Sequence, residues 1–197
     1  MIRIGITGGI GSGKSYVCNR LKQRGIPVYN CDDEAKRLMA ESPTLRQQLS
    51  ELIGSDIYIN NVLNKSAIAN YLFANADNAQ KINRIVHPAI KEDFLQWASK
   101  QKANIVAQEC ALLFEANFSD TVDKTIEVYA PQPIRLQRAM QRDHATQEQI
   151  EARMKQQMPE EEKQALADYC ILNDGTQNIE EQLDTILQDL RINIDNP

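Results

Sequence analysis

The chain has 197 residues, of which 42% are hydrophobic and 25% are charged, a balance that is ordinary for a globular protein with a sizeable core. Its net charge of -5 provides no basic face of the kind that duplex nucleic acid needs, so we expect no nucleic-acid partner. The apolar runs are too short to cross a bilayer, and the first residues lack the pattern of a secretory signal. We therefore expect a cytoplasmic protein that does not associate with membranes, and no obligate protein partner is evident.

The first predicted elements are a buried strand, a glycine-rich loop and a helix. The apolar segment 2–6 has the length of a strand, and residues 16–24 have the pattern of a helix that ends before Gly25. The residues between these two elements fit the phosphate-binding pattern G-x-x-x-x-G-K-S/T: Gly8-Gly9-Ile10-Gly11-Ser12-Gly13-Lys14-Ser15.

This loop predicts a nucleotide site. Its glycines allow successive backbone N–H groups to turn inward around a phosphate, and the N-terminus of the following helix adds a partial positive charge. Lys14 is expected to reach the β- and γ-phosphates, and Ser15 to offer its hydroxyl to Mg²⁺. The alternative is a glycine-rich turn that binds nothing. Such a turn would not explain why a strand is followed by a loop that ends in both Lys14 and Ser15.

The next segment combines one more strand with a long helical region. Residues 26–29 predict a second strand, after which a helix is expected to continue to Ala40. Residues 42–101 show several helical patterns and no convincing strand, and Pro88 is expected to interrupt the last of these helices. Phe94 and Trp97 lie on one face of the restarted helix and favour a core position over a base-stacking platform.

The remaining elements return to strands. Residues 103–108 and 125–130 predict the third and fourth strands, and the sheet closes near residues 169–172. A charged helical region occupies 133–164, and 179–190 has the apolar spacing of an amphipathic helix. Alternating strands and helices predict an α/β fold of the P-loop NTPase type, an open parallel sheet with helices on both faces. We interpret the chain as one domain, with a core of 1–33, 103–134 and 165–197, a helical substrate-binding insertion at 34–102 and a helical lid at 135–164.

Ligands bind at the carboxyl ends of the strands in such a sheet, which selects further candidate residues. Asp32 follows the second strand, where the residues support a helix N-cap and a catalytic carboxylate about equally. Glu109 ends the third strand, in the position of an acid that holds Mg²⁺ directly or through water, and its alternative is a solvated carboxylate. The four cysteines are placed singly and are expected to be reduced core residues, with Cys31 the candidate for reactivity because it lies beside candidate catalytic positions.

Three arginines, Arg135, Arg138 and Arg142, fall on one face of the helical region after the fourth strand. A solvated face is the default interpretation of such spacing. Surface ion pairs contribute only about 0–1 kcal/mol to stability, however, so ion pairing alone is a weak explanation for three aligned arginines. Beside a P-loop, a lid that closes over ATP is the favoured interpretation, with Arg138 and Arg142 as phosphate or adenine contacts.

Several separated segments together resemble one family, the dephospho-coenzyme A kinases, over almost the whole chain. The segments that carry the resemblance are Thr7-Gly8-Gly9-Ile10-Gly11-Ser12-Gly13-Lys14-Ser15, Val28-Tyr29-Asn30-Cys31-Asp32, His87-Pro88, Ala111-Leu112-Leu113-Phe114-Glu115, Arg138 with Arg142-Asp143, Arg153-Met154-Lys155-Gln156-Gln157-Met158-Pro159, Ala167-Asp168 and Asn173-Asp174-Gly175. The chain departs from the family pattern in three places. Its D-A-D motif is Asn30-Cys31-Asp32, its P-L-L-F-E motif has lost the proline, and Lys36 with Arg37 stands where the family has one arginine.

The resemblance implies transfer of the γ-phosphoryl group of ATP to the ribose 3′-hydroxyl of dephospho-coenzyme A, with Mg²⁺ as cofactor. It implies that Asp32 is the catalytic base and that Lys14 and Arg142 support the transferring group. It further implies ATP contacts from Gly11, Ser12, Gly13, Lys14, Ser15, Tyr16, Arg138, Arg142 and Asn173, and substrate contacts from Asp32, Lys36, Arg37, His87, Leu113 and Glu115. Ser15 and Glu109 are the expected metal residues, Glu109 directly or through water.

Two other function classes remain open at this point. A different small-molecule P-loop kinase would share Lys14 and Ser15 and would differ in the insertion that selects the acceptor. A GTP-dependent switch needs the guanine-reading sequence N-K-x-D, and the only Asn-Lys pair here continues as Ser66-Ala67, without the aspartate. The switch is therefore disfavoured.

Overall fold

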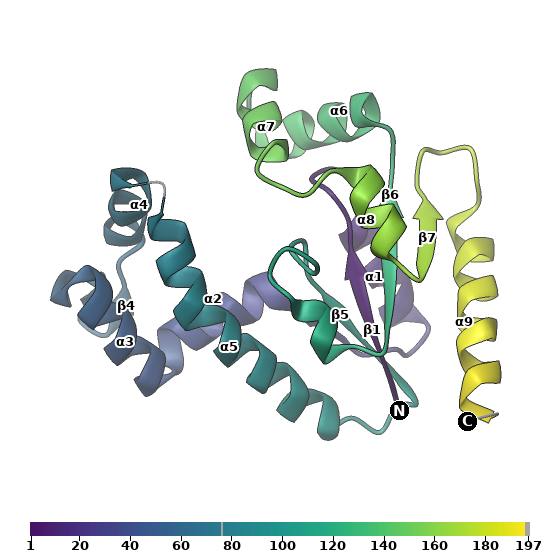
Figure 1. Cartoon of the computed structure of the whole chain (residues 1–197), viewed down its shortest axis with the longest axis horizontal. Helices are drawn as coiled ribbons and strands as arrows, with labels where there is room; N and C mark the ends of the chain where they lie inside the picture. Colours follow the sequence, from purple (N-terminus) through teal and green to yellow (C-terminus); the bar gives the residue numbers. More distant parts are fainter. Residues whose placement is uncertain (76, 196–197) are drawn as a thin grey trace. The chain divides into compact units, whose positions relative to one another are not determined.

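The computed structural model describes residues 1–75 and 77–195 and falls into two compact units. The first, which we call the sheet unit, contains Met1–Tyr29 and Lys100–Pro197. The second, the helical unit, is Asn30–Ser99. Figure 1 shows the elements of each.

The sheet unit is organised around five strands in the order β2-β5-β1-β6-β7. Their bounds are Ile2–Thr7 for β1, Val28–Asn30 for β2, Ile105–Glu109 for β5, Lys124–Tyr129 for β6 and Tyr169–Leu172 for β7. The central strand β1 runs parallel to both β5 and β6, and β7 runs parallel to β6. The predicted α/β fold with a parallel sheet is confirmed.

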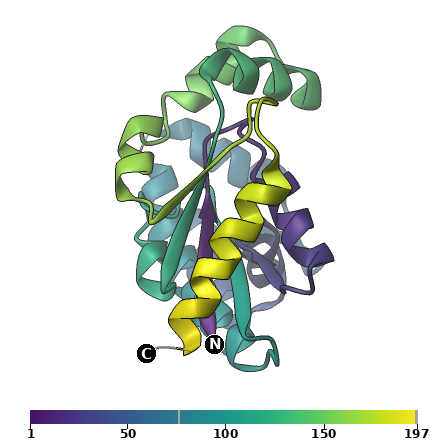
Figure 2. The same ribbon diagram turned by 90° about the vertical axis from the view of Figure 1, so that its right-hand side faces the viewer.

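Helices cover both faces of this sheet because side chains alternate along its strands. On one face, Ile126 and Val128 of β6 join a core with α1 (Lys14–Gln23) and α9 (Ile179–Asp195), the helix that crosses the sheet in Figure 2. On the other face, α8 (Glu160–Leu166) packs against β6. The buried apolar residues of the first face include Ile4, Ile6, Val17, Leu21, Ile171, Leu183, Leu187 and Leu190. Two further helices, α6 (Gln132–Asp143) and α7 (Gln147–Met154), follow β6, and the short helix η2 (Phe118–Thr121) precedes it.

The helical unit contains α2 (Cys31–Glu41), α3 (Pro43–Ile53), α4 (Lys65–Ala74) and α5 (Asn78–Ser99), with the short helix η1 (Ser55–Ile57). The structure corrects the prediction that Pro88 interrupts a helix, because α5 passes through it. Proline in a helix interior costs about 3 kcal/mol. The buried face continues across it with Val86, Ile90 and Phe94, and burial of each such side chain is worth about 1.5–3 kcal/mol, which outweighs that cost.

The prediction of no strand in this region is also wrong. β3 (Tyr58–Ile59) and β4 (Val62–Leu63) form a small antiparallel hairpin. Its two turn residues, Asn60 and Asn61, have φ of 51° and 66°, as the tight turn of a two-residue hairpin requires. Two-residue strands are too short to show alternation in a sequence.

Three of the four cysteines are buried, as expected, namely Cys18, Cys31 and Cys110. The expectation was wrong for Cys170, which is exposed. Its strand β7 is the last in the strand order of the sheet, and an edge strand has a less completely covered surface.

Candidate active site

The glycine-rich loop lies between the end of β1 and the start of α1, with Gly13 as the N-cap. Gly8, Gly11 and Gly13 have φ of 148°, 80° and 99°, a region that side chains with a Cβ rarely adopt. The surroundings leave no room for a side chain either. A Cβ on Gly11 would lie 2.1 Å from the carbonyl oxygen of Arg135, and one on Gly13 would lie 2.0 Å from Nδ2 of Asn173. The backbone of this loop is therefore fixed by both conformation and packing.

Lys14 and Ser15, the first two residues of α1, are each held at the loop. The ammonium group of Lys14 donates a hydrogen bond to the carbonyl oxygen of Gly8 at 2.6 Å, so its side chain folds back along the loop. Oγ of Ser15 donates to Oε1 of Glu109 at 2.7 Å. The carboxyl end of β5 and the start of α1 thus bring together the two residues that the sequence predicts for Mg²⁺.

This pair of oxygen ligands fits the chemistry of Mg²⁺, which proteins commonly bind through one or two carboxylates together with substrate phosphates and water. Glu109 is buried and Ser15 is exposed, so a metal could be approached from the solvent side of the pair. Within residues 1–75 and 77–195 no group of three or more His, Cys, Asp or Glu side chains is arranged to hold a metal ion. Beside this pair, a bound Mg²⁺ would take ligands from the nucleotide and from water.

Arg138 and Asn173 are linked to the loop by a chain of hydrogen bonds. Nη1 of Arg138 donates to the carbonyl oxygen of Asn173 at 2.8 Å, and Nδ2 of Asn173 donates to the carbonyl oxygen of Ser12 at 2.8 Å. Residues from α6, from the loop after β7 and from the glycine-rich loop therefore meet. Tyr16 is exposed on α1, where its hydroxyl accepts a hydrogen bond from Arg20 at 2.8 Å.

Arg142 lies in the last turn of α6, where its side chain pairs with the neighbouring carboxylate. Its side chain is 61% exposed and pairs with Asp143 at 2.7 Å. Asp143 also pairs with Arg153 at 2.7 Å, and the hydrogen bonds from these two arginines hold the pKa of its carboxyl well below its usual range. The described contacts of Arg142 do not join it to the glycine-rich loop.

Two predicted substrate residues lie in the segment after β5. Oε1 of Glu115 accepts the backbone N–H of Met158 at 2.9 Å and pairs with Lys163 at 3.1 Å. Leu113 is fully buried, and its Cδ2 lies 2.8 Å from the position that a Cβ on Gly5 would occupy. The structure therefore shows no exposed surface of Leu113 for a substrate to contact.

The helical unit contains the other acceptor candidates. Asn30, not Asp32, is the N-cap of α2, because its Oδ1 accepts the backbone N–H groups of Asp32 and Asp33 at 3.0 Å each. The cap alternative for Asp32 is therefore wrong, and its side chain is exposed in the first turn. The carboxylate of Asp32 therefore does not cap α2, and the catalytic alternative is the one that remains.

Lys36 and Arg37 lie one turn further along α2. Lys36 pairs with Asp33 at 2.9 Å, and Arg37 pairs with Glu34 and, at 2.7 Å, with Asp93. His87 is partly buried in α5, and this burial, followed by the charge of Lys91, lowers the pKa of its imidazole. His87 is therefore biased toward its neutral form.

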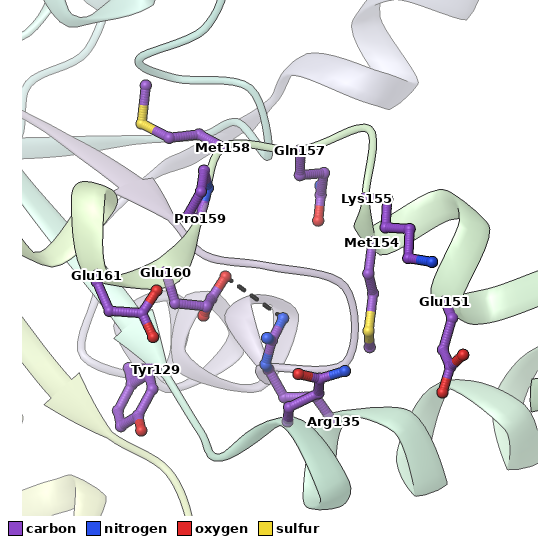
Figure 3. Close-up of a pocket in the computed structure, with 11 residues that line it drawn as sticks. Tyr129, Arg135, Glu151, Met154, Lys155, Gln157, Met158, Pro159, Glu160 and Glu161 are labelled. Carbon is purple, nitrogen blue, oxygen red and sulfur yellow. Dashed lines mark ion pairs between the residues drawn. The ribbon is translucent and has the colours of Figure 1, made fainter.

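Sequence reasoning missed a cluster of residues behind the glycine-rich loop. Arg135 and Glu160 form an ion pair at 3.3 Å, with both side chains 9% exposed, and a Cβ on Gly9 would strike both. Oε1 of Gln157 accepts the backbone N–H of Ile10 at 3.0 Å. Figure 3 shows these side chains on the wall of a pocket of about 500 Å³, where Arg135 and Glu160 point toward one another. The sequence signals for them were the spacing of the arginines on α6 and the segment 153–159, which contains Gln157, and neither signal predicted the pair of Arg135 with Glu160.

The family model for dephospho-CoA kinase matches residues 2–179. The chain belongs to the dephospho-CoA kinase family. A dephospho-CoA kinase from Bacteroides fragilis is 46% identical over 175 residues, which cover 88% of this chain and 85% of that protein. One from Porphyromonas gingivalis is 42% identical over 198 residues, covering 100% of this chain and 98% of that protein.

Solved structures match the fold of this chain. The crystal structure of TT1252 from Thermus thermophilus matches with a TM-score of 0.83 and 33% identity, over 96% of this chain and 97% of that one. A shikimate kinase from Aquifex aeolicus matches with a TM-score of 0.52 at 20% identity, over 100% of both chains, and so shares the fold alone. The resemblance to dephospho-CoA kinases that the sequence motifs indicated is confirmed. In the part of this family member that the structure describes, no helix has the length and apolar character to span a membrane.

Proposed function

We propose that this member of the dephospho-CoA kinase family transfers the γ-phosphoryl group of ATP to the ribose 3′-hydroxyl of dephospho-CoA, which yields CoA and ADP in the final step of CoA biosynthesis. The observation that carries the proposal is the glycine-rich loop that ends in Lys14 and Ser15, with Ser15 hydrogen-bonded to Glu109 at the end of the neighbouring strand. A cytoplasmic location, expected from the sequence, belongs to the same proposal.

The nucleotide would bind at the glycine-rich loop. The backbone of Gly11, Ser12 and Gly13 would surround its phosphates, and Lys14 would exchange the carbonyl oxygen of Gly8 for phosphate oxygens. Arg138 and Asn173 already contact one another beside this loop, which supports a role for both in ATP binding. Arg142 would exchange Asp143 for the nucleotide when the segment closes, and Tyr16 is the exposed aromatic residue at the start of α1.

Ser15 and Glu109 would hold Mg²⁺, Glu109 directly or through water. When bound, the ion neutralises charge on the β- and γ-phosphates. The hydrogen bond that joins the two residues keeps the hydroxyl and the carboxylate at one place before any ligand arrives. Lys14 adds a further cation at the same end of the sheet.

At the acceptor, Asp32 would orient the ribose 3′-hydroxyl and accept its proton. The bond from this oxygen to the γ-phosphorus forms as the bond from that phosphorus to the β–γ bridging oxygen breaks, and ADP leaves with the electron pair of the broken bond. Because the transition state is loose, orientation by Asp32 contributes at least as much as its basicity. We propose that Lys36, Arg37, His87, Leu113 and Glu115 contribute to binding of the same substrate.

The test is release of ADP in a coupled assay with dephospho-CoA, AMP, adenosine and shikimate offered in turn. Dephospho-CoA should be preferred strongly, because the pantetheine arm gives binding energy remote from the reacting hydroxyl that can position the ribose. Adenosine should lose turnover as well as affinity. Equal turnover with adenosine, or preference for shikimate, would contradict the proposed acceptor.

A further inference from the structure

Gln157 contacts the glycine-rich loop from the segment that joins α7 to α8 (Figure 3). Its Oε1 accepts the backbone N–H of Ile10 at 3.0 Å, a partly buried hydrogen bond between residues 147 positions apart in the sequence. The mechanism proposed above gives Gln157 no role.

Ile10 lies in a turn that does not use this N–H itself. The backbone N–H of Ser12 donates to the carbonyl oxygen of Gly9 at 3.1 Å, so the four residues from Gly9 to Ser12 form a β-turn. Gly11, the third residue of the turn, has a φ of 80°, as a type II turn requires. The hydrogen bond inside such a turn leaves the N–H of the second residue without a partner, and a backbone N–H that is removed from water needs one. Gln157 provides that partner from a distant segment.

The hydrogen bond at Ile10 also determines where the carbonyl group of Gly9 points. The peptide group that joins these two residues is planar, with its C=O and its N–H on opposite edges, so the direction of one fixes the direction of the other. The carbonyl oxygen accepts the N–H of Ser12 at 3.1 Å and Nζ of Lys14 at 3.5 Å. Gln157 therefore holds a peptide group whose other edge contacts both the turn and the lysine of the loop.

Gly9 itself restrains this peptide group little, because glycine has the widest choice of backbone conformations. It is buried against the ion pair of Arg135 with Glu160. A Cβ on Gly9 would lie 2.3 Å from Nη1 of Arg135 and 2.2 Å from Oε1 of Glu160. The ion pair thus excludes a side chain that would stiffen the backbone at this position, and the orientation of the peptide group depends on its hydrogen bonds.

The backbone beside Gln157 is anchored to another part of the sheet unit. The N–H of Met158 donates to Oε1 of Glu115 at 2.9 Å, and Glu115 pairs at 3.1 Å with Lys163, whose side chain is 0% exposed. The segment that carries Gln157 is therefore fastened to the residues after β5. This anchor sets the place from which the amide of Gln157 meets the loop.

We propose that Gln157 is a positioning residue for the glycine-rich loop, whose side-chain oxygen fixes the Gly9–Ile10 peptide group and, through it, the turn of residues 9–12. Without this acceptor the peptide group rotates more easily, and the N–H of Ser12 loses its carbonyl partner for part of the time. The loop must then be ordered again when a phosphate binds, which lowers affinity. The inference rests on the proposed function in one respect, that nucleotide phosphates are the ligand of the loop.

The first measurement is amide hydrogen exchange of the full chain without ligand, followed residue by residue by NMR. Gln157→Met keeps the length of the side chain and removes the acceptor oxygen, whereas Gln157→Glu keeps an acceptor oxygen at the same place. In Gln157→Met the amides of both Ile10 and Ser12 should exchange about two- to tenfold faster, the change expected for the loss of one ordinary hydrogen bond. In Gln157→Glu both should exchange as slowly as in the natural protein, and the amides of β1 and β6 should be unaffected in either variant.

The second measurement is calorimetric titration with ADP. Gln157→Met should weaken ADP binding by about two- to tenfold. The matched control is Gln156→Met, which changes an exposed glutamine one position earlier and should alter neither exchange nor affinity. Gln157→Ala replaces Gln157→Met should that variant fail to fold.

Four results would overturn the inference. Faster exchange at Ile10 alone would show that the turn does not depend on Gln157, and fast exchange in Gln157→Glu would show that the acceptor oxygen is not the cause. Weaker ADP binding with unchanged exchange would mean that Gln157 contacts the nucleotide directly, and equal effects in Gln156→Met would make the change unspecific. Absence of ADP binding by the natural protein would contradict the proposed function instead, because the exchange measurement is made without ligand and still decides whether Gln157 holds the turn.

Discussion

Replacing Asp32 by asparagine should separate catalysis from folding at the start of α2. The cap of this helix comes from Asn30, whose Oδ1 accepts the N–H groups of residues 32 and 33 at 3.0 Å each, and the substitution leaves both groups in place. It removes one exposed negative charge beside the helix N-terminus, an interaction worth about 0.3–1 kcal/mol. The free energy of unfolding, measured in urea, should therefore fall by less than about 1 kcal/mol.

Turnover should respond far more strongly, because asparagine cannot accept a proton from the ribose hydroxyl. A positioned general base contributes roughly 10²–10⁴ in rate, which corresponds to about 3–5 kcal/mol of activation free energy. The measurement is ADP release at saturating ATP and dephospho-CoA. Retention of more than a tenth of the turnover would refute the role of Asp32 as base.

Two matched variants complete this test. Asp33→Asn removes the same charge from the same turn and breaks an ion pair with Lys36 whose partners are 71% and 70% exposed, so turnover should change by no more than a few-fold. Asn30→Ala removes the cap and should cost about 1 kcal/mol of stability. Greater sensitivity of turnover at Asp33 than at Asp32 would mean that the base is misassigned.

Three other predictions follow from the sheet unit. Lys14→Ala should abolish turnover while circular dichroism shows an intact fold. Near-normal turnover of this variant at saturating ATP would show that the loop is not the phosphate site. Gly13→Ala should weaken ADP binding by at least tenfold in calorimetry, because its φ is 99° and the new Cβ would lie 2.0 Å from Nδ2 of Asn173. For Asp168, partial burial is outweighed by hydrogen bonds from Lys124 and Thr125, so the pKa of its carboxyl is lowered. Its stabilisation is present above the unfolded pKa near 4 and lost as pH falls through the lower folded value, so Asp168→Asn should destabilise the protein at pH 7 and progressively less below pH 4 in urea unfolding.

The parts of the fold that the sequence predicted are those specified by short, local patterns. The glycine-rich loop needs particular residues at fixed spacing, and the strand before it is a single apolar run. Asn30 was missed as the cap because Asp32 suits the same position equally well, and the choice depends on where the second strand ends. The prediction of a break at Pro88 was wrong because it considered only the low helix propensity of proline. The buried face that continues through α5 stabilises the helix across this residue.

The polar residues behind the loop could not be predicted, because their burial depends on contacts between distant segments. Lys163 is an example: it lies in a helix with the sequence EEEKQAL, which reads as a solvated surface, and yet it is 0% exposed. Its ammonium group pairs with Glu115 at 3.1 Å and donates to the carbonyl oxygen of Ala111 at 3.3 Å, both in the segment after β5. No residue near position 163 in the sequence indicates that Lys163 would contact Glu115 or Ala111.

Burial of such charges brings a large desolvation penalty, so it is weak evidence for stability and calls for another explanation. Several exceptions to local rules in the sheet unit gather at one place: Gly8, Gly11 and Gly13 at positive φ, the buried pair of Arg135 with Glu160, the buried Lys163, and Glu127, whose carboxyl oxygens have no hydrogen bond among the described residues. Local rules are expected to fail where function demands a strained or charged arrangement. The position of these exceptions, around the end of β1 where the phosphates of ATP are proposed to bind, is therefore an argument for that site that is independent of the sequence motif.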